Sequence, residues 1–69
     1  MQGNSIRVEI SRLLNVRKKL NEEEYITSRE EDETSTILGI GRFKDKKDML
    51  FKINDFFAWL NKELGEKAN

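Results

Sequence analysis

Apolar residues in the last third of the chain recur at helical spacing between Asp45 and Leu64. At about 100° per residue, most of them fall within one arc of roughly 120°. This stripe comprises Met49, Leu50, Ile53, Phe56, Phe57, Leu60 and Leu64. Phe51 and Trp59 lie outside the arc, toward the opposite side of the same helix. The pattern predicts a helix over residues 46–64 with one buried face and a second face that carries two large aromatic side chains.

The ends of this helix carry their own signals. Asp45 is a preferred N-cap residue, and Asp48 follows three residues later, close to the pattern of a capping box. Gly65 follows the last apolar residue of the stripe, at a position where glycine commonly ends a helix in the left-handed conformation. We therefore expect the helix to begin after Asp45 and to end before Gly65.

The N-terminal segment also carries a helical stripe, which comprises Ile6, Ile10, Leu13, Leu14, Val16 and Leu20. Ser5 can cap the start of this segment as a helix. Three cations at positions 17–19 would lie in its last turn, where the negative end of the helix dipole stabilises positive charge. The pattern predicts a first helix over Ser5–Asn21. The alternation of apolar residues at positions 6, 8 and 10 leaves a short strand before a shorter helix as an alternative.

The middle of the chain is rich in β-branched and aromatic residues on both sides of a charged run at positions 29–33. This arrangement predicts an antiparallel hairpin that pairs residues 24–28 with residues 34–43 around an exposed turn. Gly39 and Gly41 would share one face of the second strand and let a helix pack closely. The expected fold is α+β, a helix–β-hairpin–helix (αββα) with two helices on a small antiparallel sheet.

A second helix that begins after Ser28 is the alternative for the middle segment, with Glu31 completing a capping box. The chain would then be an all-α three-helix bundle. The predicted hairpin turn contains neither Gly nor Asn, which tight hairpins prefer. However, Thr34, Ser35 and Thr36 are poor helix formers, so the sequence favours the hairpin.

Composition limits the chemistry of the chain. The 69 residues make one domain, with residues 1–4 and 66–69 expected to be disordered ends. The chain has no Cys and no His, which removes thiol catalysis, the commonest general base and the commonest metal ligands. We expect no enzymatic activity, no catalytic residues, no cofactor, no metal and no small-molecule substrate. The chain also has no run of apolar residues that could span a membrane, so a cytoplasmic protein is expected.

Charge is unevenly distributed although the net charge is zero. Residues 1–21 carry a net charge of +4, residues 22–34 carry −6 and residues 35–52 carry +3. The acidic block in residues 22–34 lacks the alternating ligands and central Gly of an EF-hand loop. These segments can pair within the molecule, which is the simpler interpretation, or the acidic block can be displayed to steer a basic partner.

The aromatic face of the last helix is the main candidate site. Phe51 and Trp59 flank Asp55, and Lys62 lies on the same face. Trp is enriched at binding hot spots. The favoured hypothesis is therefore a small protein-interaction module, a stoichiometric regulator or inhibitor of another protein, in which this face binds the partner. A two-stranded sheet is marginal by itself and could pair its edge with that of a second copy, so a homodimer is expected. In the alternative, both aromatics pack against the first helix of the same chain.

A basic segment gives a second hypothesis, a small nucleic-acid-binding protein. Its candidate contacts are Arg42, Phe43, Lys44, Lys46 and Lys47, which follow two glycines and run into a helix N-terminus. Phe43 could stack on a base. Arg17 lies within the apolar arc of the first helix, where it can extend its stem to solvent, pair with an acid, or bind a partner. A third hypothesis is a structural homo-oligomer subunit.

Overall fold

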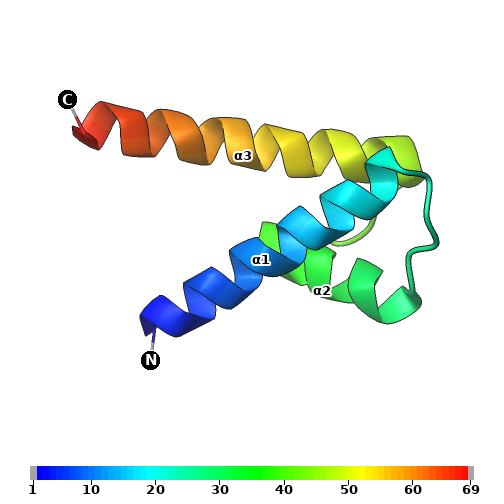
Figure 1. Cartoon of the computed structure of the whole chain (residues 1–69). Helices are drawn as coiled ribbons and strands as arrows, with labels where there is room; N and C mark the ends of the chain where they lie inside the picture. The colour runs from blue at the N-terminus through cyan, green and yellow to red at the C-terminus, as the bar shows by residue number, and fades with distance from the viewer. Residues whose placement is uncertain (1, 69) are drawn as a thin grey trace.

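The computed structural model of this chain consists of helices, and it describes the backbone of residues 2–68 and the side chains of residues 6–65. Helix α1 spans Gln2–Asn21, α2 spans Ser28–Leu38 and α3 spans Lys46–Ala68. The end of α1 lies beside the beginning of α3, and from there the two helices diverge toward the chain termini (Figure 1). Helix α2 packs against both of them.

The predicted hairpin is wrong, and with it the α+β class. Within residues 2–68 there is no strand. Residues 34–38 of the second predicted strand form the last part of α2, its residues 39–43 lie in the linker to α3, and the predicted turn at residues 29–33 is helical. The all-helical alternative fits the structure. Its capping box lies one residue earlier than expected, because Thr27 is the N-cap and Glu30 is its partner. The Thr27 hydroxyl accepts a hydrogen bond from the Glu30 amide at 3.0 Å, and the Thr27 amide donates to the Glu30 carboxylate at 3.0 Å.

Two of the hydroxyl-bearing residues that argued against a helix are accommodated by hydrogen bonds within α2. The hydroxyl of Thr34 donates to the carbonyl of Glu30 at 2.7 Å, and the hydroxyl of Ser35 donates to the carbonyl of Asp32 at 2.9 Å. Thr34 is 1% exposed, so its methyl group packs inside the molecule while its hydroxyl is satisfied. These local bonds and the capping box offset the weak helix propensity of the segment.

Both α1 and α2 end in a Schellman motif with one residue in the left-handed conformation. Gly39 has a φ of 73°, and its amide and that of Ile40 donate to carbonyls in the last turn of α2. Glu23 has a φ of 57° after α1, and the amide of Glu24 donates to the carbonyl of Lys19 at 2.8 Å. A side chain at a left-handed position is strained, so Glu23 costs stability that glycine would not.

The boundaries of the outer helices differ from the prediction. Helix α1 begins at Gln2, so Ser5 lies within the helix and is not its cap, and the alternative of an N-terminal strand is also wrong. Helix α3 begins after Asp45 as expected, but it continues through Gly65 to Ala68. Gly65 therefore does not end the helix. Residues 2–4 belong to α1 and residues 66–68 to α3, whereas Met1 and Asn69 lie outside the described residues. The prediction of disordered ends at residues 1–4 and 66–69 stays a prediction.

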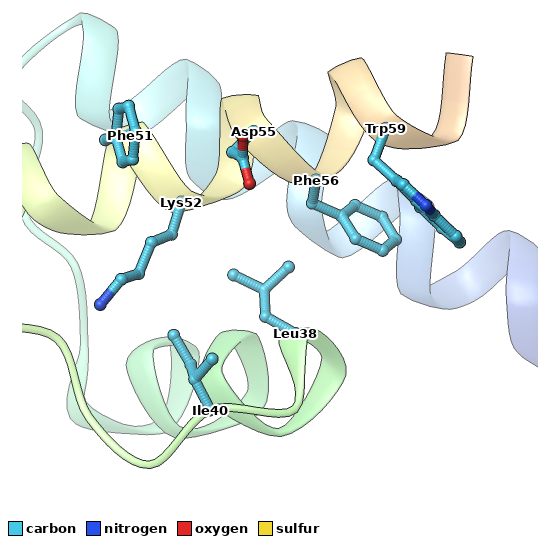
Figure 2. A pocket seen from close by; sticks show the side chains of 7 residues that line it. All are labelled: Leu38, Ile40, Phe51, Lys52, Asp55, Phe56 and Trp59. Carbon is cyan, nitrogen blue, oxygen red and sulfur yellow. The ribbon is translucent and has the colours of Figure 1, made fainter. Parts of the chain in front are cut away.

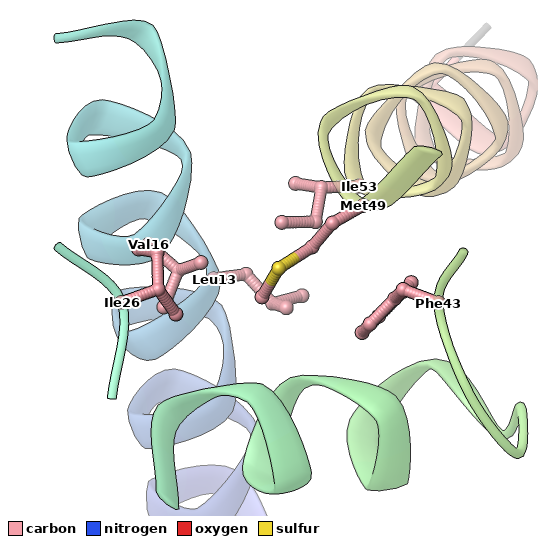
Figure 3. Packing of buried hydrophobic residues seen from close by; sticks show 6 residues of the cluster. All are labelled: Leu13, Val16, Ile26, Phe43, Met49 and Ile53. Carbon is pink, nitrogen blue, oxygen red and sulfur yellow. The ribbon is translucent and has the colours of Figure 1, made fainter. Parts of the chain in front are cut away.

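The core is small and draws on the linkers as well as on the helices (Figure 3). Its buried apolar residues are Leu13, Val16, Ile26, Phe43, Met49 and Ile53. Ile26 comes from the linker between α1 and α2, and Phe43 from the linker between α2 and α3. Because both linkers are anchored in the core, the end of α2 is held against α3. Within the described residues, none of the helices combines the length and apolar character needed to cross a membrane.

Candidate apolar groove on α3

A groove with a volume of about 360 Å³ lies between α3 and the end of α2 (Figure 2). It is lined by Leu38, Ile40, Phe51, Lys52, Asp55, Phe56 and Trp59. We call this set the aromatic groove. Phe51, Asp55 and Trp59 come from positions i, i+4 and i+8 of α3, which places them along one face of the helix. The structure thus brings three of the four partner-binding residues predicted from the sequence to one surface.

The opposite wall was not predicted, because it depends on how α2 ends. Leu38 is the last residue of α2, and Ile40 follows the left-handed Gly39. The turn at Gly39 directs both apolar side chains toward α3, where Leu38 points at Phe56 (Figure 2). The sequence held a signal for this arrangement, since an apolar residue directly after a helix-ending glycine commonly packs back on the last turn.

Trp59 is exposed but held by neighbouring rings. Its ring centroid lies 6.0 Å from that of Phe56, and Phe56 in turn lies 5.8 Å from Phe57 in an edge-to-face arrangement. Arg17 of α1 places its guanidinium 4.8 Å from the centre of the Phe57 ring, a cation–π contact. Arg17 is half-buried and lies against this aromatic series. The contacts restrict the aromatic side of the groove before any partner binds, which lowers the entropic cost of binding.

The two aromatics singled out by the sequence are largely open to solvent. Phe51 is 67% exposed and Trp59 is 55% exposed, so neither ring is buried within the molecule. They lie toward opposite ends of the groove along α3 (Figure 2). Solvent contact over large aromatic rings is unfavourable, and aromatic side chains bury about 150–250 Å² each when fully covered. Covering these two rings would therefore contribute substantially to binding.

The polar groups of the groove have different partners. The Lys52 ammonium binds the Asp48 carboxylate at 3.1 Å. The backbone amide of Lys44, followed by this Lys52 contact, lowers the pKa of Asp48 from its usual range. Asp55 is exposed, and among the described side chains of residues 6–65 it forms no ion pair. A negative charge thus lies within an apolar surface, between Phe51 and Trp59.

Lys62, the fourth predicted partner-binding residue, is exposed on α3 but does not line the groove. Lys52 and Phe56 line it instead, although the sequence pattern did not mark either of them as a site residue. Phe56 belongs to the apolar stripe of α3, so helical spacing by itself predicts that it is a core residue. Only the position of α2 makes one edge of Phe56 part of the groove.

The basic segment lies at the start of α3, where Arg42, Lys44, Lys46 and Lys47 are all exposed. Phe43 is 6% exposed and belongs to the core, so it cannot stack on a base without leaving the core. Two carboxylates already occupy the helix N-terminus: Asp45 accepts from the Asp48 amide at 2.8 Å, and Asp48 accepts from the Lys44 amide at 2.9 Å. These contacts leave an incoming phosphate fewer free amides and add negative charge close to the site.

The acidic block is partly neutralised within the molecule. Lys19 of α1 binds Glu30 of α2 at 2.6 Å, and Glu33 lies 3.8 Å from Arg12 and 3.4 Å from Arg29. The Lys19 ammonium, together with the Thr27 amide, holds the pKa of Glu30 below its usual range. The Lys19–Glu30 and Arg12–Glu33 pairs join basic α1 to acidic α2, in agreement with the interpretation that the charged segments pair within the molecule. Among the described residues, no group of three or more acidic side chains could hold a metal ion.

No known protein family, curated protein or solved structure matches this chain.

Proposed function

We propose that this chain is a non-enzymatic protein-interaction module that binds an amphipathic helix of another protein in the aromatic groove. The observation that carries the proposal is the pair of exposed rings, Phe51 and Trp59, beside the apolar wall formed by Leu38 and Ile40. Buried aromatic anchors surrounded by apolar residues are typical of interface hot spots. Stoichiometric regulation or inhibition of the partner is the role expected of such a module, and a cytoplasmic location stays a prediction.

The charge within the groove indicates the chemistry of the partner. Asp55 has no ion pair among the described side chains, whereas Lys52 is already bound to Asp48. A partner helix that carries one Lys or Arg beside its apolar anchors would pair with Asp55 as the surface is covered. An acidic partner residue in the same place would be repelled. Apolar anchors give affinity in this arrangement, and the charge gives orientation.

A selection from a displayed library of helical peptides tests this proposal directly. We expect selected peptides to combine two or three apolar residues on one face with a basic residue. Binding should change the fluorescence of Trp59, which is the only Trp in the chain. Trp59→Ala should weaken binding by about 2 kcal/mol or more, roughly 30-fold. Asp55→Lys should select against basic peptides, which tests the charge separately from the rings.

Val8→Ala is the matched control, because Val8 is an exposed apolar residue on α1 outside the groove. It should leave peptide binding unchanged. Equal binding to wild type and Trp59→Ala would contradict the proposal. So would binding of single- or double-stranded DNA or RNA that falls steeply between low and physiological salt and depends on Arg42 and Lys47, because that behaviour is typical of backbone contacts.

A further inference from the structure

The apolar stripes of α1 and α3 continue beyond the region where the two helices pack together. Ile6 precedes the buried Leu13 by seven residues, or about two turns, and lies on the same face of α1. Leu64 follows the buried Ile53 by eleven residues, or about three turns, on the same face of α3. Because the helices diverge toward the termini, these stripe residues have no partner helix at that end (Figure 1). Ile6 is 56% exposed and Leu64 is 59% exposed.

We call this region the open end, and it comprises Ile6, Ile10, Leu14, Leu60 and Leu64. Ile10 and Leu60 are half-buried, and Leu14 is 43% exposed. The region is distinct from the aromatic groove, with which it shares no residue. In a helical protein, a stripe of this kind is normally covered along its whole length. The open end therefore lacks a covering element.

The total accessible surface is too large for a compact monomer of this mass. The chain exposes 5526 Å². A folded monomer of its 8.2 kDa exposes about 4,500 Å² by the general relation between surface and mass. The excess is about 1,000 Å², and a standard interface removes roughly 800 Å² from each partner. This excess is summed over the whole molecule, the aromatic groove included, and it has the size of one protein–protein interface.

We propose that the open end is covered by a second copy of this chain in a two-fold symmetric dimer. The open end can pair with its own copy because it has two parts. One is the N-terminal half of α1, which projects from the molecule, and the other is the C-terminal half of α3, which has no helix beside it (Figure 1). A two-fold axis would place the α1 half of each copy against the α3 half of the other. Arg7 flanks Ile6, and Glu63 flanks Leu64, so the same packing brings opposite charges to the rim. The net charge of zero removes any general repulsion between copies.

Sedimentation velocity of the full chain over a concentration series to about 100 µM tests the dimer. The informative variants are Ile6→Glu and Leu64→Glu, which change exposed residues and should retain helicity by circular dichroism. Each should raise the dissociation constant of the dimer at least about tenfold, equivalent to about 1.4 kcal/mol. Val8→Glu is the control, because Val8 is 46% exposed on the opposite side of α1. It should dimerise as the wild type does.

A wild type that remains monomeric at the highest concentration would overturn the dimer, as would one whose dimer survives both open-end variants. If both variants unfold, the open end is core rather than interface, and the proposal is wrong. Trp59→Ala separates this inference from the proposed function, since it should weaken peptide binding roughly 30-fold and leave the dimer intact. A dimer lost in Trp59→Ala but kept in Leu64→Glu would place the interface in the aromatic groove and overturn the inference.

Discussion

Two glycine-to-alanine substitutions, Gly39→Ala and Gly65→Ala, should change stability in opposite directions. Gly39 ends α2 at a φ of 73°, whereas Gly65 lies within α3. A Cβ added at either position meets no atom within 4 Å, so packing contributes nothing to the difference. The backbone conformation alone therefore determines whether each substitution raises or lowers the free energy of unfolding. The pair therefore tests both the helical nature of the middle segment and the length of the last helix.

The expected magnitudes follow from the backbone conformations. At Gly39, the left-handed conformation costs alanine about 1–2 kcal/mol, and the stiffer unfolded chain returns about 0.4–1 kcal/mol. The net loss is about 1 kcal/mol. At Gly65, helix propensity favours alanine by up to about 1 kcal/mol, which fraying near the helix end reduces to about 0.5 kcal/mol. For a chain of this size, Gly39→Ala should lower the melting temperature by roughly 5 °C, and Gly65→Ala should raise it by roughly 3 °C.

Thermal and urea unfolding followed by far-UV circular dichroism measures both effects. Gly39→Asn is the matched control, because Asn tolerates the left-handed conformation and should lose less stability than Gly39→Ala. If Gly65→Ala lost as much stability as Gly39→Ala, Gly65 would be a left-handed helix end, as the sequence suggested. If Gly39→Ala were neutral, the end of α2 described here would be wrong, and with it the wall of the groove.

Three further predictions concern single residues. Glu23→Gly should raise the free energy of unfolding by about 0.5–1 kcal/mol, measured by urea titration, because it relieves a left-handed side chain. Thr27→Ala should lower it by about 1 kcal/mol, since it removes one half of the capping box, and an unchanged midpoint would contradict that role. The pKa of Glu30 is lower in the folded state than in the unfolded chain, mainly through Lys19. The stabilisation that Glu30 contributes is thus complete at pH values above its pKa in the unfolded chain, and it is lost as the pH falls through its lowered pKa in the folded state. Glu30→Gln should flatten the acid limb of a stability–pH curve.

Only one wall of the aromatic groove could be predicted from the sequence. The α3 side followed from helical period, because Phe51, Asp55 and Trp59 must share a face on any straight helix. The other wall, Leu38 and Ile40, required the knowledge that residues 28–38 are helical. In the predicted strand, Leu38 and Ile40 would have shared the face opposite Gly39 and Gly41, away from the helix expected to pack there. Because the middle segment was predicted as a hairpin, the second wall of the groove could not be predicted.

The cause of that error is a competition between intrinsic propensity and local hydrogen bonds. Thr34, Ser35 and Thr36 lower helix propensity by a few tenths of a kcal/mol each. The Thr27–Glu30 box and the hydroxyl bonds of Thr34 and Ser35 act in the opposite direction. Burial of Thr34 and the Lys19–Glu30 pair add tertiary contacts that the sequence does not reveal. The sum favours a helix, although the propensities alone favoured a strand.

The sequence by itself determined that the two ends of the chain form amphipathic helices, that α3 carries a second, aromatic face, and that Cys and His chemistry is absent. These conclusions depend only on composition and on the 3.6-residue period, which is a local property of the backbone. Only the tertiary structure decided that Phe43 is core, that Phe51 and Trp59 face solvent, and that the stripes around Ile6 and Leu64 lie uncovered. Periodicity gives the face of a helix that will be buried, but the length over which it is buried depends on where the partner helices diverge.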